Sequence, residues 1–176
     1  MRTSSSVRKL TLSAMLVAVG LLLPFVTGQI RVIGNMLSPM HLPVFVAGLV
    51  CGPAWGLVVG AVLPLLRSFL FGMPPLMPTA AAMAFELAAY GLFSGLLRAM
   101  LPRTLPMLYV ALAVSMVLGR VVWGFASLMF YGFVNRSFTW QLFVTNGFIN
   151  AIPGIVLQFI VIPPIVRALE KTRLVD

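Results

Sequence analysis

Residues 105–133 read LPMLYVALAVSMVLGRVVWGFASLMFYGF, a run in which Arg120 is the one charged side chain. A helix that crosses the hydrocarbon core of a bilayer needs about 20 apolar residues, within a range of about 17–25. This run is longer than that range. It therefore predicts a membrane-spanning helix that has enough length to tilt.

The rest of the chain shares this composition. The 176 residues are 61% hydrophobic and 9% charged, and the mean hydropathy is +1.09. A soluble domain carries about 25% charged residues, and a small domain leaves a large share of its surface outside its core. Lipid must therefore surround most of this surface, and the composition predicts an all-α integral membrane protein.

Apolar stretches predict a single transmembrane domain over residues 1–176, folded as a bundle of six segments. They lie at about 10–26, 40–51, 54–71, 79–101, 105–133 and 138–166. The second is too short to span as a regular helix, and Pro39 and Pro43 bracket its start, so we expect a broken or short second segment. Irregular backbone is tolerated at membrane depth only where protein or a water-filled cavity covers it.

Lysine and arginine are distributed unevenly between the two predicted sides of the membrane. The two ends and the link between the fourth and fifth segments carry Arg2, Arg8, Lys9, Arg98, Arg103, Arg167, Lys171 and Arg173. The opposite loops, at 27–39, 72–78 and 134–137, carry only Arg31 and Arg136. Since cytoplasmic loops are enriched in basic residues, we expect both termini to be cytoplasmic.

The first segment has a second interpretation. Basic residues followed by an apolar run ending at Val26-Thr27-Gly28 also fit a cleaved signal peptide. The apolar run is longer than a usual signal core, and its loss would leave five segments and put the termini on opposite sides. A spanning segment is therefore the preferred interpretation.

Several polar side chains fall inside the predicted segments. Such groups are costly in lipid and usually face the bundle interior or a cavity. Counted along the helices at about 1.5 Å per residue, they lie mostly in the outer half of the bilayer, which favours a binding pocket that opens outward. The candidate substrate-binding residues are Arg67, Glu86, Tyr90, Arg120, Trp123, Asn146 and Asn150.

A purely structural role is the alternative for these residues. Glu86 would then pair with an arginine, and the amides would hold helices together. However, Arg67 and Arg120 face one acid, which leaves a buried positive charge. The set as a whole therefore favours a bound ligand.

Small residues recur every four positions in three places. Such stripes let helix backbones approach closely, and internal packing is the expected role of Gly48, Gly52, Gly56 and Gly60 and of Gly91 and Gly95. Ala14 and Ala18 differ because they lie on an end segment that is free to face another subunit. They are the candidate docking residues.

Motifs of several function classes are missing from the sequence. There is no GxxxxGK[ST] phosphate loop. His41 is the only histidine and Cys51 the only cysteine, which argues against a metal site, a nucleophilic pair and a disulfide framework. The basic residues are scattered singly, which argues against nucleic acid. We expect no enzymatic activity and no cofactor.

Two runs of sequence carry a family resemblance. They are Met40-His41-Leu42-Pro43-Val44 … Gly48 … Gly52-Pro53-Ala54-Trp55-Gly56 … Gly60, and Pro64-Leu65-Leu66-Arg67 … Phe71-Gly72-Met73-Pro74-Pro75 … Pro78-Thr79-Ala80 … Met83-Ala84-Phe85-Glu86-Leu87 … Tyr90-Gly91. With its size and six segments, the chain resembles the substrate-binding S components of energy-coupling factor (ECF) transporters. The branch that it resembles includes carriers of pantothenate, hydroxymethylpyrimidine and pyridoxine.

The resemblance implies a function and a set of partners. Such a protein captures a water-soluble vitamin or vitamin precursor outside a bacterial cytoplasmic membrane and docks onto a transmembrane coupling subunit, and two ATPase subunits drive uptake. Members dock through an Ala-xxx-Ala motif on the first helix, where this chain has Ala14 and Ala18.

Three further points remain open at this level. The excess positive charge slightly favours pantothenate, a carboxylate, over hydroxymethylpyrimidine or pyridoxine. A non-transporting structural or assembly subunit of a membrane complex is the alternative function. A stand-alone secondary transporter is disfavoured because the chain lacks two halves related by an inverted repeat.

Overall fold

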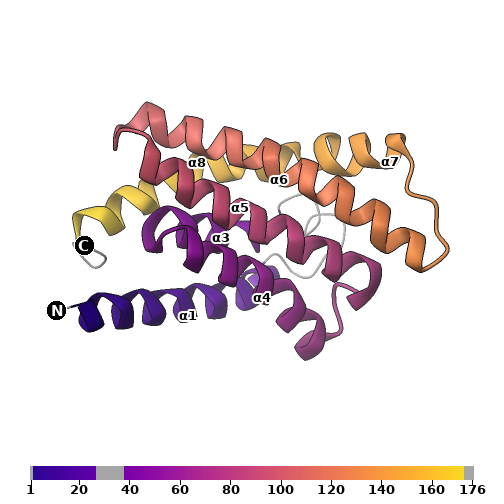
Figure 1. The fold of residues 1–176 in the computed structure, drawn as a ribbon, viewed down its shortest axis with the longest axis horizontal. Helices are drawn as coiled ribbons and strands as arrows, with labels where there is room; N and C mark the ends of the chain where they lie inside the picture. Colours follow the sequence, from indigo (N-terminus) through magenta and orange to yellow (C-terminus); the bar gives the residue numbers. More distant parts are fainter. Residues whose placement is uncertain (1, 27–37, 173–176) are drawn as a thin grey trace.

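The computed structural model describes residues 2–26 and 38–172 (Figure 1). All regular structure in these residues is helical. Five helical stretches are long and apolar enough to cross a membrane, namely Ser6–Phe25, Pro53–Phe71, Leu76–Met100, Leu105–Phe133 and Trp140–Lys171. A shorter apolar helix, His41–Cys51, makes a sixth segment. These helices confirm the all-α membrane bundle expected from the sequence.

The helical elements follow one another with short connections. In chain order they are α1 (Arg2–Val26), α3 (His41–Val46), the π-helical turn η1 (Ala47–Cys51), α4 (Pro53–Phe71), the π-helical turn η2 (Leu76–Ala80), α5 (Ala81–Met100), α6 (Leu105–Phe133), α7 (Trp140–Val144), the π-helical turn η3 (Thr145–Ile149) and α8 (Ile152–Lys171). The predicted outer loop at 27–39, with Arg31, lies outside the described residues except for its last two.

The second segment is short and irregular, as the sequence predicts. It changes from α-helix to a π-helical turn at Ala47 and ends at Gly52, whose φ of 102° favours glycine. Pro53 then begins α4, a position where its missing N–H has no intrahelical partner to lose. Val44, Phe45 and Ala47 have no exposed surface. Protein therefore covers this irregular backbone, which is the condition for keeping it within a membrane.

The tightest contact in the bundle joins α4 and α5 through their glycines. A Cβ atom added to Gly56 would collide with the backbone of Gly91, and one added to Gly91 would collide with that of Gly56. One on Gly60 would collide with the backbone of Leu87. The two glycine stripes therefore face each other, which confirms the internal packing role expected from their spacing. Gly52 is the exception, because a Cβ atom there would meet nothing within 4 Å.

The last segment is broken, which the sequence interpretation did not anticipate. After η3, residues 150 and 151 form a turn, and the amide of Asn150 donates to the carbonyl of Thr145 at 2.8 Å. Pro153 stands at the start of α8 and has no amide hydrogen to continue a helix from Ile149. A new helix therefore begins here instead of one regular helix running from 138 to 166.

The parts of the described chain that carry the predicted cytoplasmic lysines and arginines lie together at one end of the long axis (Figure 1). The start of α1, the link between α5 and α6 and the end of α8 share this end. Arg98 of α5 donates to Glu170 of α8 at 2.6 Å, which ties two of these elements. The turn after α6, with Arg136, lies at the opposite end. The arrangement thus groups the basic residues that the sequence assigns to one side of the membrane.

Candidate functional site

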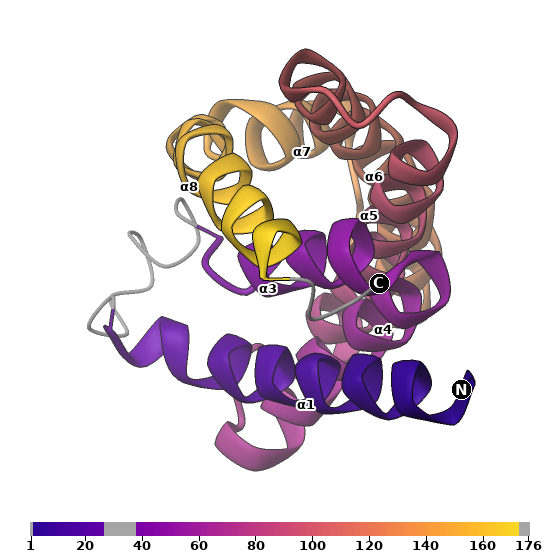
Figure 2. The ribbon, with the colours of Figure 1, turned by 90° about the vertical axis from the view of Figure 1, so that its left-hand side faces the viewer.

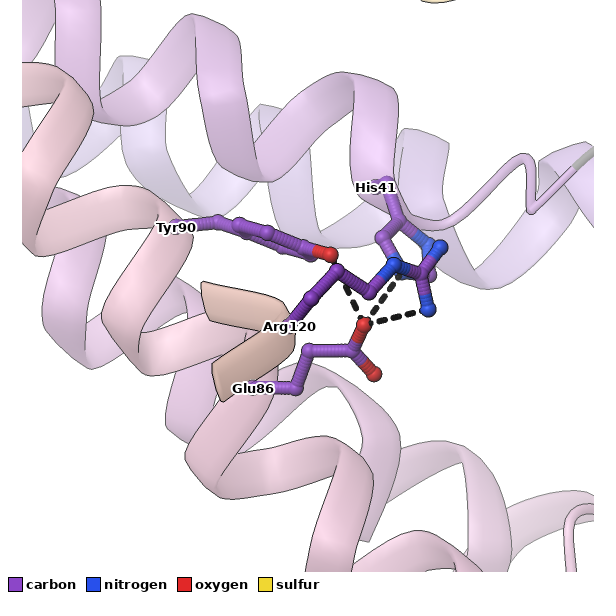
Figure 3. Close-up of polar contacts among 4 residues, drawn as sticks. All are labelled: His41, Glu86, Tyr90 and Arg120. Atoms are coloured by element: carbon purple, nitrogen blue, oxygen red, sulfur yellow. Dashed lines mark hydrogen bonds and ion pairs between the residues drawn. The ribbon is translucent and has the colours of Figure 1, made fainter. Parts of the chain in front are cut away.

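The carboxylate of Glu86 is the centre of a buried polar group on α5 (Figure 3). Glu86 is only 2% exposed. Its Oε1 lies 2.7 Å from Nη1 of Arg120 on α6 and accepts a hydrogen bond of 2.8 Å from the hydroxyl of Tyr90. Tyr90 follows Glu86 by one helical turn, so both side chains leave the same face of α5. Three of the residues predicted from the sequence are therefore in direct contact.

The ring of Tyr90 is held between three helices. Its centroid lies 4.9 Å from that of Phe45 and 5.4 Å from that of His41, both on α3. On the α6 side, a Cβ atom added to Gly119 would collide with the Tyr90 ring. Gly119 therefore leaves the space that the ring occupies, and the hydroxyl is aimed at Glu86 by packing on both faces.

His41 completes this polar group, although sequence reasoning did not assign it a role. It stands at the first residue of α3, and its side chain points toward Glu86 (Figure 3). Nε2 of His41 lies 3.8 Å from Oε1 of Glu86, which is too long for a hydrogen bond. His41 is 4% exposed, and neither ring nitrogen has a hydrogen-bond partner. The signal in the sequence was a lone histidine at the start of a wholly apolar run.

Arg67 makes its contacts elsewhere. Its Nη1 donates to the carbonyl of Leu21 on α1 at 2.9 Å. Its guanidinium carbon lies 5.5 Å from the ring centroid of Phe25 and 5.7 Å from that of Phe71, which is the geometry of cation–π contacts. Arg67 thus attaches the end of α1 to α4. The two arginines do not converge on Glu86, so the excess positive charge expected in one pocket is absent from this group.

A second group lies farther along α6, one turn beyond Arg120. The ring of Trp123 lies 6.0 Å from that of Phe143 and 5.6 Å from that of Phe138. A Cβ atom added to Gly147 of η3 would lie 3.4 Å from Trp123. The η3 turn bears Asn146, which accepts a hydrogen bond of 3.1 Å from Asn150.

This second group is more open than the first. Asn146 and Asn150 are exposed, and Trp123 is partly buried. The two amides bond to each other as residues one turn apart do. Nothing in the described contacts joins them to Glu86, so the structure brings together two parts of the predicted set and leaves Arg67 apart from both.

The candidate docking residues lie on the surface of the bundle. Ala14 and Ala18 are exposed, whereas Ser13, Gly20 and Pro24 of the same helix are buried. α1 runs along the edge of the bundle, where α3 and α4 cover one of its sides (Figure 2). The alanine face is therefore open to lipid or to another protein.

A hollow of about 300 Å³ lies at the end of the bundle that carries Arg136. It is formed by the 72–80 connection and the turn after α6, and its lining residues are Pro75, Met77, Pro78, Thr79, Val134 and Arg136. Glu86 and its partners do not line it. Among the described residues, no three His, Cys, Asp or Glu side chains gather where they would hold a metal ion.

These features define the class of protein. The bundle is membrane-embedded, carries a charged and aromatic group between α3, α5 and α6, and exposes a small-residue stripe at its edge. Buried ionisable groups in a membrane segment usually belong to a ligand or ion site. The chain is therefore a multi-pass membrane protein suited to binding a small molecule.

The comparison with protein families gives the particular class. The family of the ECF transporter, substrate-specific component, matches residues 8–166. The chain belongs to this family, which makes it a non-enzymatic, substrate-specific subunit of a transporter. The match confirms the resemblance to S components, and the substrate branch stays a prediction. Membership implies a small-molecule substrate and the partner subunits of an ECF module. No curated protein and no solved structure matches the chain.

Proposed function

We propose that the chain captures a small water-soluble vitamin or vitamin precursor at the group formed by His41, Glu86, Tyr90 and Arg120. The observation that carries this proposal is the buried Glu86 carboxylate, which is only 2% exposed and is approached by side chains from three helices. A buried ion pair adds little net stability by itself. A ligand that uses the same polar atoms gives a reason for keeping charged groups at this depth.

The charges of this group bear on the substrate. Pantothenate was favoured because two arginines opposed one acid, but Glu86 neutralises Arg120 and Arg67 bonds to Leu21. A bound carboxylate would then be a buried charge without a partner, and burying such a charge costs several kcal/mol. We therefore rank a neutral ring compound, such as hydroxymethylpyrimidine or pyridoxine, above pantothenate.

The proposed orientation puts this group on the side from which substrate arrives. The basic end of the bundle would face the cytoplasm of a bacterial cell, and both termini with it. The end with Arg136 and the 72–78 connection would face outward. Glu86 stands five residues after the start of α5, or about 7.5 Å along that helix, which is the outer half of the bilayer.

The proposed partners would act through α1. The exposed stripe of Ala14 and Ala18 offers close backbone approach to a transmembrane coupling subunit. Two ATPase subunits would then supply the energy.

The test is direct binding to the isolated protein. Purified protein in detergent should bind one member of a panel of hydroxymethylpyrimidine, pyridoxine and pantothenate in isothermal titration calorimetry. The variant Glu86→Gln should lose most of the affinity, because it keeps the shape and removes the charge. If no panel member binds, the proposed substrate class is wrong.

A further inference from the structure

His41 differs from the other polar residues of the proposed site. Glu86, Tyr90 and Arg120 satisfy one another, whereas neither nitrogen of the His41 ring has a hydrogen-bond partner. The residue is 4% exposed. More than about 90% of buried polar groups in native structures are hydrogen-bonded, and each exception needs an explanation. Leaving such a group unpaired costs about 1–3 kcal/mol.

The surroundings do not supply a partner. The polar contact of His41 is with Glu86 Oε1, at 3.8 Å, and this oxygen already lies 2.7 Å from Arg120 and accepts a hydrogen bond from Tyr90. The other contact of the ring is with the Tyr90 ring, which is tilted by 52° relative to it. The ring nitrogens therefore stand beside a filled acceptor and an aromatic surface (Figure 3).

We propose that His41 is a specificity-determining residue, whose ring nitrogens hydrogen-bond the captured substrate. This inference rests on the proposed function of the same site. A neutral imidazole offers one donor and one acceptor, so it selects a ligand that presents a hydroxyl group or a ring nitrogen at this position. Because Glu86 and Arg120 balance each other, the ligand carries no net charge.

Such a role also explains why the unpaired ring is retained. A site that hydrogen-bonds its substrate discriminates strongly against analogues that lack the matching group, since the buried polar atoms are then left unpaired. The cost of the unpaired ring in the empty protein is recovered when substrate arrives. An apolar residue in its place would remove both the cost and the discrimination.

The test compares His41→Leu and His41→Gln with the wild type and uses two readouts. His41→Leu should lower the affinity for the panel member that the wild type binds best by roughly tenfold or more, the loss of about one or two hydrogen bonds. It should leave the melting temperature of the ligand-free protein unchanged or higher, because an unsatisfied polar group is gone. His41→Gln keeps a donor and an acceptor and should retain part of the affinity.

Ser13→Ala is the matched control. The Ser13 hydroxyl is also buried without a hydrogen-bond partner but belongs to α1, so its removal should leave the affinity unchanged. If His41→Leu binds as tightly as the wild type, or loses stability and affinity together, the role assigned to His41 is wrong. If the wild type binds no panel member, the proposed function fails and this inference fails with it.

Discussion

Replacing Arg120 with methionine tests whether the polar group is one coupled unit. Methionine keeps most of the length of the side chain but removes the charge that lies 2.7 Å from Glu86. The carboxylate, at 2% exposure, then retains only the hydroxyl of Tyr90 at 2.8 Å. His41, at 3.8 Å, is too far to replace the lost bond in its present position.

The size of the effect follows from this geometry. Removing one partner of a buried ion pair destabilises a protein by about 3–5 kcal/mol, because an uncompensated charge remains. We expect the lower end of that range for Arg120→Met, since Tyr90 continues to donate to Glu86. For a chain of this length, the loss corresponds to a fall of the melting temperature on the order of 10 °C.

The double variant Glu86→Gln, Arg120→Met isolates the pair. It removes both charges, so it should be more stable than the sum of the two single changes predicts by about 2–3 kcal/mol. The free energy of unfolding is measured by titrating sodium dodecyl sulfate into mixed micelles and following the circular dichroism. Arg136→Met, the loss of an exposed arginine at the end of α6, is the control and should change it by less than about 0.5 kcal/mol.

Strict additivity of the two single changes would refute this reasoning. The ion pair would then contribute nothing as a pair, and Glu86 and Arg120 would each be held by other contacts.

Two further predictions concern orientation and docking. A cysteine that replaces Met77, in the connection between α4 and α5, should react with an impermeant maleimide in intact cells. A cysteine that replaces Thr104, at the opposite end of the bundle, should react only after lysis. The reverse pattern would invert the proposed orientation. The native Cys51 is buried and should give little background. Replacing Ala14 and Ala18 with leucine should abolish uptake and leave the ligand affinity of the isolated protein within about twofold, because close helix approach is lost far from Glu86; an equal loss of binding would show that the stripe is needed for folding.

The membrane segments were predictable because hydropathy and length decide them. The apolar run at 105–133 coincides with α6, and the short second segment was visible from Pro39, Pro43 and the Gly52-Pro53 turn. Helix ends were less accurate. α1 begins at Arg2, not at residue 10, because a helix continues through the polar residues Thr3–Lys9 once the apolar part has formed it.

The break in the last segment was not predicted because hydropathy alone does not show where a helix is interrupted. Pro153 was present in the sequence, but the run from 138 to 166 has no charged residue and was interpreted as one helix. Hydropathy describes which solvent a residue prefers and carries no information on backbone hydrogen bonds. The proline signal therefore had to be weighed separately.

The neighbours of each polar residue were harder to predict than their depth. Counting residues along a helix gives a height in the membrane, and this placed Arg67 near Glu86. The direction in which a side chain leaves its helix depends on which helices are adjacent, and Arg67 leaves α4 toward α1. Glu86, Tyr90 and Arg120 were grouped correctly because Glu86 and Tyr90 share a helix face and the acid needed a basic partner.

The closest backbone contact in the bundle joins α4 to α5, the helix that bears Glu86 and Tyr90. Glu86 and Tyr90 stand on α5, whose backbone meets that of α4 at Gly56 and Gly91 with no room for a methyl group. Few residues in the apolar part of α1 are buried, whereas more than half of those in the segment that contains α5 are. Arg67 attaches the end of α1 to α4. α1 packs against α3, which bears His41, as well as against α4, so a partner that binds α1 acts on both helices. Movement between α4 and α5 would require glycine backbones already in contact to pass each other, so docking should leave the α4–α5 contact intact.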